Sequence, residues 1–114
     1  MKHALDGIRA GLVNEPNMMI HFCAAVVVIV FGLTIKLTIL EWSICLILCG
    51  LVIALELMNT AVEAVVDLVT KDFDKQAKLA KDTAAGAVLV AAIVAAVVGG
   101  LIFVPKIILL FQGG

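Results

Sequence analysis

Three long runs without a charged residue constrain the fold of this chain more than any other feature of its sequence. Residues 18–35, 42–55 and 83–105 contain no Asp, Glu, Lys or Arg, and 64% of the 114 residues are hydrophobic. A helix needs about 20 apolar residues to cross the hydrocarbon of a bilayer. We therefore expect an all-α integral membrane protein with three transmembrane helices.

The segments between these runs indicate where the spans begin and end. Residues 1–14 alternate apolar and charged residues at helical spacing, which predicts a short amphipathic helix at the membrane surface. Pro16 is tolerated best in the first turn of a helix, so the next helix is expected to start beside it. We expect one domain over residues 1–114, with the surface helix at about 1–14 and spans at about 17–36, 41–68 and 80–105.

Small residues predict close helix packing in two places. Gly7 and Gly11 form a pair four residues apart, and alanines and glycines recur at the same interval over residues 91–100. Trp42, beside the turn after the first span, is typical of an aromatic anchor at a membrane interface.

Charge indicates the compartment and excludes some partners. Six of the eight basic residues lie in residues 1–14 and 67–82, so the positive-inside rule places these segments and the N-terminus in the cytoplasm and the C-terminus outside. A net charge of −1 argues against a nucleic-acid partner. No A-x-A cleavage site follows the N-terminus, so a removed signal peptide is not expected, and three cysteines without ligand spacing predict neither a disulfide framework nor a zinc site.

The second span carries polar side chains on one face. At 100° per residue they fall within an arc of about 100°: Glu56, Asn59, Thr60, Glu63 and Asp67. Measured from Trp42, Glu56 lies below the opposite membrane boundary and Glu63 about 10 Å further along. Acids inside a span are costly, so we expect function here, although pairing with Lys81 to hold the bundle together is the alternative.

The residue types in and beside this stripe suit phosphoryl transfer. Carboxylates without a histidine or cysteine cluster favour Mg²⁺, which uses one or two carboxylates together with substrate phosphates. Glu15 and Glu63 are expected at similar depths and could share one ion, and Lys81 is the best placed cation for the phosphates. Glu56, which is deeper, suits the task of accepting a hydroxyl proton. Neither soluble kinase signature, GxxxxGK[ST] or GxGxxG with a catalytic loop, is present.

Two central motifs carry a resemblance to a known family. ALELMNTAVEAVVDLV at 54–69 and AKLAKDTAAGAVLVAA at 77–92 strongly resemble the prokaryotic integral-membrane diacylglycerol kinase family, in the subgroup with the undecaprenol kinases of Gram-positive bacteria. GIRAGLVNEPNMMIH at 7–21, EW at 41–42 and FVPK at 103–106 extend the similarity over nearly the whole chain.

This resemblance implies a homotrimer whose active sites are shared between neighbouring subunits on the cytoplasmic face. It implies that Glu56 is the general base, that Asn59 assists at the reacting centre, and that Glu15 and Glu63 hold Mg-ATP. It further implies that Lys81 contacts the nucleotide phosphates.

Other positions match the family pattern less closely. Asp82 is implied as a support of the nucleotide site, and Arg9 and Asn17 fall at loosely defined positions of that site. His21 either hydrogen-bonds near the nucleotide or is a packing or interfacial residue. Met18 stands where members usually have an aromatic residue, and DFDKQAK replaces a histidine-proline loop.

We therefore expect an ATP-dependent lipid kinase of the bacterial plasma membrane. Its substrate would be the hydroxyl of undecaprenol or diacylglycerol, a choice that the generic aliphatic residues of the spans leave open. The alternative from another class is a small transporter or channel subunit that handles cations or protons through its membrane acids. Such proteins favour mid-membrane acids and repeats, whereas here the acids gather at one face. A purely structural subunit does not explain this asymmetry.

Overall fold

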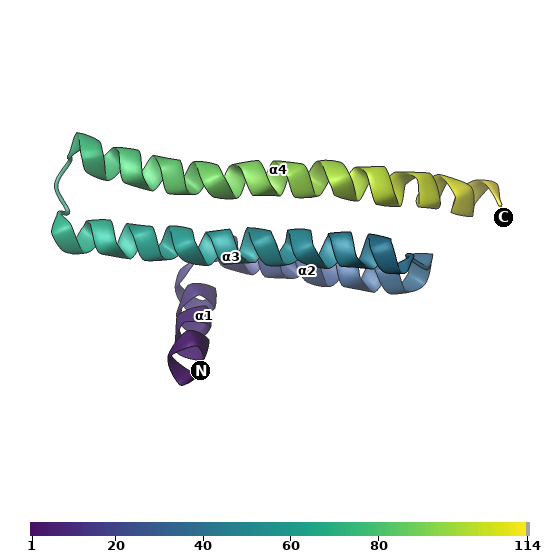
Figure 1. Cartoon of the computed structure of the whole chain (residues 1–114), viewed down its shortest axis with the longest axis horizontal. Helices are drawn as coiled ribbons and strands as arrows, with labels where there is room; N and C mark the ends of the chain where they lie inside the picture. The colour runs from purple at the N-terminus through teal and green to yellow at the C-terminus, as the bar shows by residue number, and fades with distance from the viewer. Residues whose placement is uncertain (114) are drawn as a thin grey trace.

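The computed structural model describes residues 1–113, and Gly114 lies outside that range. The described chain forms four helices: α1 (Lys2–Asn14), α2 (Pro16–Ile35), α3 (Ile39–Val69) and α4 (Lys75–Gln112). The last three are long and apolar enough to cross a membrane. The all-α membrane fold expected from the sequence is thereby confirmed. α3 lies beside both α4 and α2, and α1 runs across the bundle (Figure 1).

Local chemistry explains where these helices begin and end. Glu15 is extended (φ −117°, ψ 111°) and Pro16 occupies the first turn of α2, so the chain turns sharply after α1. Lys36 ends α2 in the left-handed conformation (φ 61°). A capping box begins α3: Thr38 Oγ1 accepts from the Glu41 amide, and the Glu41 carboxylate accepts from the Thr38 amide.

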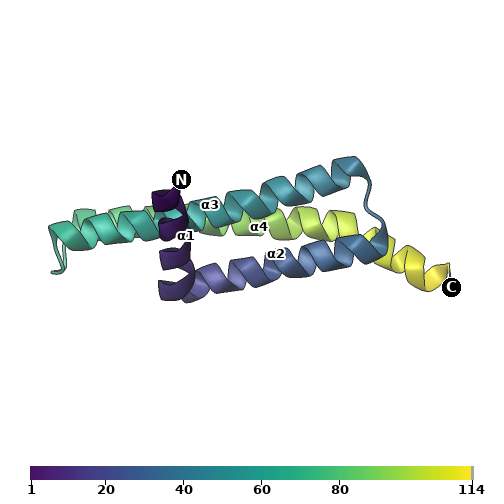
Figure 2. The ribbon, with the colours of Figure 1, turned by 90° about the horizontal axis from the view of Figure 1, so that it is seen from below.

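The crossing of α1 over α3 depends on one glycine. A Cβ on Gly11 would lie 3.0 Å from Leu57 Cδ2 and 3.6 Å from Met18 Cε, whereas nothing lies within 4 Å of one on Gly7. Of the predicted glycine pair, Gly11 alone makes a close contact. Met18, fully buried at 0% exposure, fills the corner between α1, α2 and α3. Figure 2 shows that α3 continues well beyond the point where α1 crosses it.

At the opposite end of the bundle, α2, α3 and α4 are tied together by two contacts. A Cβ on Gly32 would lie 2.6 Å from Trp42 Cη2, so this glycine admits the indole, which is half-buried against α2. Glu41 pairs with Lys106 of α4 at 3.0 Å. α4 continues through Pro105. A proline removes only one backbone hydrogen bond, and transmembrane helices tolerate this loss. The apolar residues after Lys106 are therefore helical as far as Gln112.

The bundle is open along most of its length. At most 22% of the residues in the most apolar window of any long helix are buried in the chain alone. The few buried apolar side chains are Met18, Cys45, Val52, Val88 and Ala91. A chain with this much exposed apolar surface needs lipid or further subunits around it, which agrees with a membrane location.

Candidate active site

Two polar side chains are buried on α3, within a single turn. Glu56 is 2% exposed and Asn59 is 7% exposed, and among residues 1–113 no other charged or polar side chain is buried. Each has an oxygen, Glu56 Oε1 and Asn59 Oδ1, without a hydrogen-bond partner in the described chain. Buried polar atoms are normally paired, so these two atoms indicate a place where another group is expected to bind.

The carboxylate of Glu56 faces α2. Its Oε2 lies 3.7 Å from His21 Nε2, and His21 is half-buried. Two further acids act electrostatically on Glu56: Glu15, at the start of α2, and Glu63, two turns further along α3. The corner formed by α1 and α2 thus brings His21 and Glu15 to the polar stripe of α3.

The stripe itself is organised by contacts along the helix. Asn59 Nδ2 donates a hydrogen bond to Glu63 Oε1 at 3.2 Å, one turn away. Thr60 Oγ1 donates to the Glu56 backbone carbonyl at 3.1 Å. The amide of Asn59 therefore orients the half-buried Glu63 carboxylate, while the Thr60 hydroxyl is used by the backbone of its own helix.

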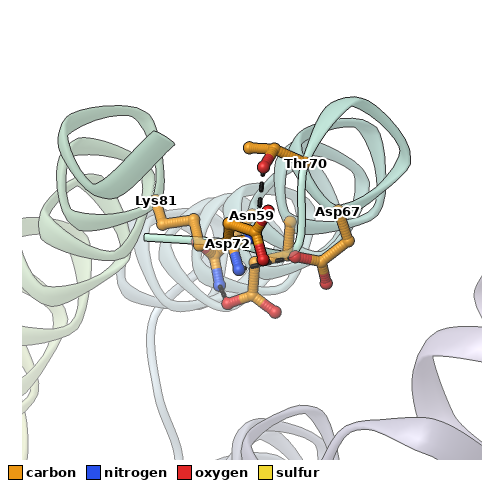
Figure 3. Close-up of polar contacts among 6 residues, drawn as sticks. Asn59, Asp67, Thr70, Asp72 and Lys81 are labelled. Carbon is orange, nitrogen blue, oxygen red and sulfur yellow. Dashed lines mark hydrogen bonds and ion pairs between the residues drawn. The ribbon is translucent and has the colours of Figure 1, made fainter. Parts of the chain in front are cut away.

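A separate cluster lies near the turn between α3 and α4. Lys81 Nζ of α4 donates to Asp67 Oδ1 of α3 at 2.7 Å, which joins the two helices, and this cluster is drawn in Figure 3. Asp82 pairs with Lys78, one turn earlier on α4. The Asp67–Lys81 pairing agrees with the structural alternative for Asp67, and it leaves two of the three ammonium hydrogens of Lys81 for another acceptor.

Not all residues implied by the resemblance come together. Arg9 and Asn17 are exposed, and their side chains make no hydrogen bond or ion pair within residues 1–113. Contacts join His21 to Glu56 and Asn59 to Glu63, and Glu15 lies near Glu56. Lys81 pairs with Asp67 and also lies near Glu63, whereas Asp82 pairs with Lys78 toward the α3–α4 turn.

The oxygen donors of the site suit a magnesium ion that is bound together with phosphates. Within the described residues no three side chains of His, Cys, Asp or Glu gather closely enough to form a protein-only metal cage. Magnesium does not need such a cage, because it binds one or two carboxylates and takes its other ligands from phosphates and water. The carboxylates of Glu15 and Glu63 are hard oxygen donors and both are half-buried, so the residues present fit this ion.

The contact of His21 with Glu56 was missed by the sequence reasoning, although a signal for it was present. The sequence predicts similar depths for Glu15, at the start of one span, and Glu63, at the end of the next. His21 lies six residues beyond Glu15 and Glu56 seven before Glu63, about 9 and 10 Å at 1.5 Å per residue. Equal depth on neighbouring helices makes the contact possible, whereas the direction of the side chains decides whether it forms.

Comparison with known proteins identifies the family. The model of a family described as Prokaryotic diacylglycerol kinase matches residues 2–103. The chain is 45% identical to the undecaprenol kinase of Bacillus subtilis (strain 168) over 105 residues, covering 92% of this chain and 85% of that protein. It is 39% identical to a diacylglycerol kinase of Synechocystis over 108 residues, covering 94% of this chain and 62% of that protein. Identity to the diacylglycerol kinase of Escherichia coli (strain K12) is 30%, covering 83% of this chain and 78% of that one.

These matches confirm the resemblance inferred from the two central motifs. They also confirm the expectation of an enzyme, a lipid kinase, and do not favour the transporter or channel alternative. By the extent of the family match and the identity of its relatives, this chain belongs to the prokaryotic diacylglycerol kinase family.

Proposed function

We propose that this protein transfers the γ-phosphate of Mg-ATP to the hydroxyl of a membrane lipid alcohol, undecaprenol or diacylglycerol. The observation that carries the proposal is the gradient of burial along α3. Glu56 is almost fully buried with one oxygen unpartnered, and Glu63, two turns away on the same face, is half-buried. A lipid hydroxyl and a polar nucleotide would need groups at two such depths.

In the reaction, the Glu56 carboxylate takes the proton of the lipid hydroxyl. The hydroxyl oxygen forms a bond to the γ-phosphorus, and the bond between that phosphorus and the β,γ-bridging oxygen breaks, which leaves ADP and the lipid phosphate. Burial of Glu56 supports this role, because a base screened from water keeps its carboxylate available to the lipid. Asn59, whose amide donates a hydrogen bond to Glu63, would present its unpartnered Oδ1 to the reacting groups.

The nucleotide end of the site would be formed by the other residues of the two clusters. Glu15 and Glu63 would hold the magnesium ion of Mg-ATP, and that ion, when bound, neutralises charge on the phosphates. Lys81 would contact the phosphates with the hydrogens that Asp67 does not use. Asp82, Arg9 and Asn17 are assigned to the rim of the nucleotide site on the resemblance alone.

Assembly and orientation complete the proposal. The exposed apolar faces of α2, α3 and α4 support a homotrimer, with sites shared between neighbouring subunits. The positions of the basic residues support a cytoplasmic N-terminus and active site. The identity to the Bacillus subtilis undecaprenol kinase makes a polyprenol the first alcohol to test, in competition with diacylglycerol and labelled ATP.

The test of the base is Glu56→Gln, assayed in mixed micelles with Mg-ATP and each lipid. Loss of the proton acceptor should lower kcat by about 100-fold or more. Glu41→Gln is the matched control, because Glu41 lies at the far end of the same helix and pairs with Lys106. Near-normal turnover of a folded Glu56→Gln protein would exclude Glu56 as the base.

A further inference from the structure

His21 is the basic group that contacts the proposed base. Its Nε2 lies 3.7 Å from Glu56 Oε2, with the His21 side chain 20% exposed and that of Glu56 3% exposed. Within residues 1–113, no other Lys, Arg or His side chain lies within ion-pairing distance of this carboxylate. The contact therefore gives Glu56 its one basic partner in the described chain.

Acidic groups on two helices lie near Glu56. From the corner of α1 and α2 it faces Glu15, and along α3 it faces Glu63, so two acids repel its charge. His21 on α2 is the group that attracts it. In a largely apolar environment such interactions are poorly screened, so this one basic neighbour strongly affects the orientation of the Glu56 carboxylate.

The other surroundings of His21 do not suit a nucleotide. The imidazole lines a cavity of about 260 Å³ between α2, α3 and α4. The remaining wall consists of aliphatic side chains, one glycine and two thiols, with Ala25, Val52 and Ala92 among them. A phosphate would find no cation there besides His21 itself. The ring thus lies where the polar stripe meets the apolar interior, deeper than Glu15 and Glu63.

We propose that His21 is a positioning residue for Glu56 and not part of the nucleotide site. This inference rests on the proposed role of Glu56 as the base. The imidazole Nε2 lies 3.7 Å from Glu56 Oε2, beyond hydrogen-bond distance, and orients the carboxylate through this electrostatic contact. The second oxygen, the buried and unpartnered Oε1, is then the atom that accepts the proton of the lipid hydroxyl.

Two substitutions at position 21 test this assignment. His21→Leu removes the donor, and His21→Gln keeps an N–H close to the position of Nε2. We expect His21→Leu to lower kcat by about tenfold to a hundredfold, because a misplaced base reacts slowly, with KM for Mg-ATP unchanged. His21→Gln should recover most of the loss. Cys49→Ala, in the wall of the same cavity, is the packing control and should retain normal turnover.

The contrary outcomes are distinct. A raised KM for Mg-ATP with normal kcat in His21→Leu would assign His21 to the nucleotide, and equal losses in the Leu and Gln variants would assign it to packing. If the Leu variant does not fold, His21→Phe replaces it, because phenylalanine keeps a planar ring without a donor. The same fall in kcat with unchanged KM is expected. If the base assignment itself is wrong, Glu56→Gln keeps its turnover. If the His21 inference alone fails, Glu56→Gln is inactive while His21→Leu has normal kcat.

Discussion

At the scale of single residues, the unusual atoms are two buried oxygens in an otherwise apolar interior. Leaving a buried polar atom unpaired costs about 1–3 kcal/mol, so Glu56 Oε1 and Asn59 Oδ1 each lower the stability of the chain alone. Active sites retain such groups because the reaction needs them. Removing one of these oxygens should therefore lower activity without lowering stability.

We expect Asn59→Leu to show this separation. The change removes the unpartnered oxygen and adds apolar surface, so the thermal midpoint in detergent should be equal to or higher than that of the unmodified protein. Turnover should fall about tenfold or more, because Glu63 loses its amide donor and the reacting centre loses Oδ1. Thr60→Val, at the next position, is the control and should change neither quantity much, since its hydroxyl bonds only to the backbone. Normal turnover in Asn59→Leu would remove Asn59 from the site.

Lys81 and Asp67 form an ion pair whose two members are expected to differ in function. If Lys81 contacts the nucleotide phosphates, Lys81→Met should raise KM for Mg-ATP about tenfold, the effect of losing one charged contact. Asp67→Asn removes only the partner within the protein, and because both side chains are partly exposed, KM should change little. Steady-state kinetics over a range of ATP concentrations measures both. Equal rises in KM would mean that Asp67 also belongs to the nucleotide site.

At the scale of the elements, what the sequence predicted followed from local chemistry. The uncharged runs predicted three spans. The capping box of Thr38 and Glu41 was not predicted, although its spacing of three residues is visible in the sequence. The pairing of Lys78 with Asp82 follows the i, i+4 rule. The pairing of Lys81 with Asp67 could not be chosen from sequence over other partners, because it depends on how α4 returns beside α3. The crossing of α1 at Gly11 likewise depends on tertiary packing.

The contact of α1 with α3 gives a prediction at this scale. Gly11→Val should lower both the thermal midpoint and turnover, because the added atoms meet Leu57, the residue next to Glu56, and push α1 away. Gly7→Ala is the matched control on the same helix. With nothing near its Cβ, it should keep full activity and gain up to about 1 kcal/mol of stability from helix propensity. Thermal unfolding in detergent and lipid kinase assays measure the two effects. Unchanged turnover in Gly11→Val would mean that close packing of α1 on α3 is not needed for catalysis.

At the scale of the whole molecule, the bundle is open, so the single chain does not show what contacts its exposed apolar surfaces. The depth of Glu56 and Glu63 was predictable, because depth follows from distance along a helix. The neighbours of the stripe were not, since they depend on side-chain direction and on surfaces that the single chain leaves exposed. Those surfaces on α2, α3 and α4 are available to lipid and to the neighbouring subunits of the homotrimer that the family resemblance implies.

Mixed assembly tests that proposal directly. If each site takes Glu56 from one subunit and Lys81 from its neighbour, Glu56→Gln and Lys81→Met chains that are weak alone should restore one another when co-assembled in equal amounts. Random mixing would leave about a quarter of the sites with both intact groups, so about a quarter of normal activity should return at low ATP. Mixing after separate assembly in detergent, without subunit exchange, is the control and should restore nothing. If trimers that contain both chains recover no activity, Glu56 and Lys81 act within one chain. The pairing of Lys81 with Asp67 of the same chain is compatible with that arrangement.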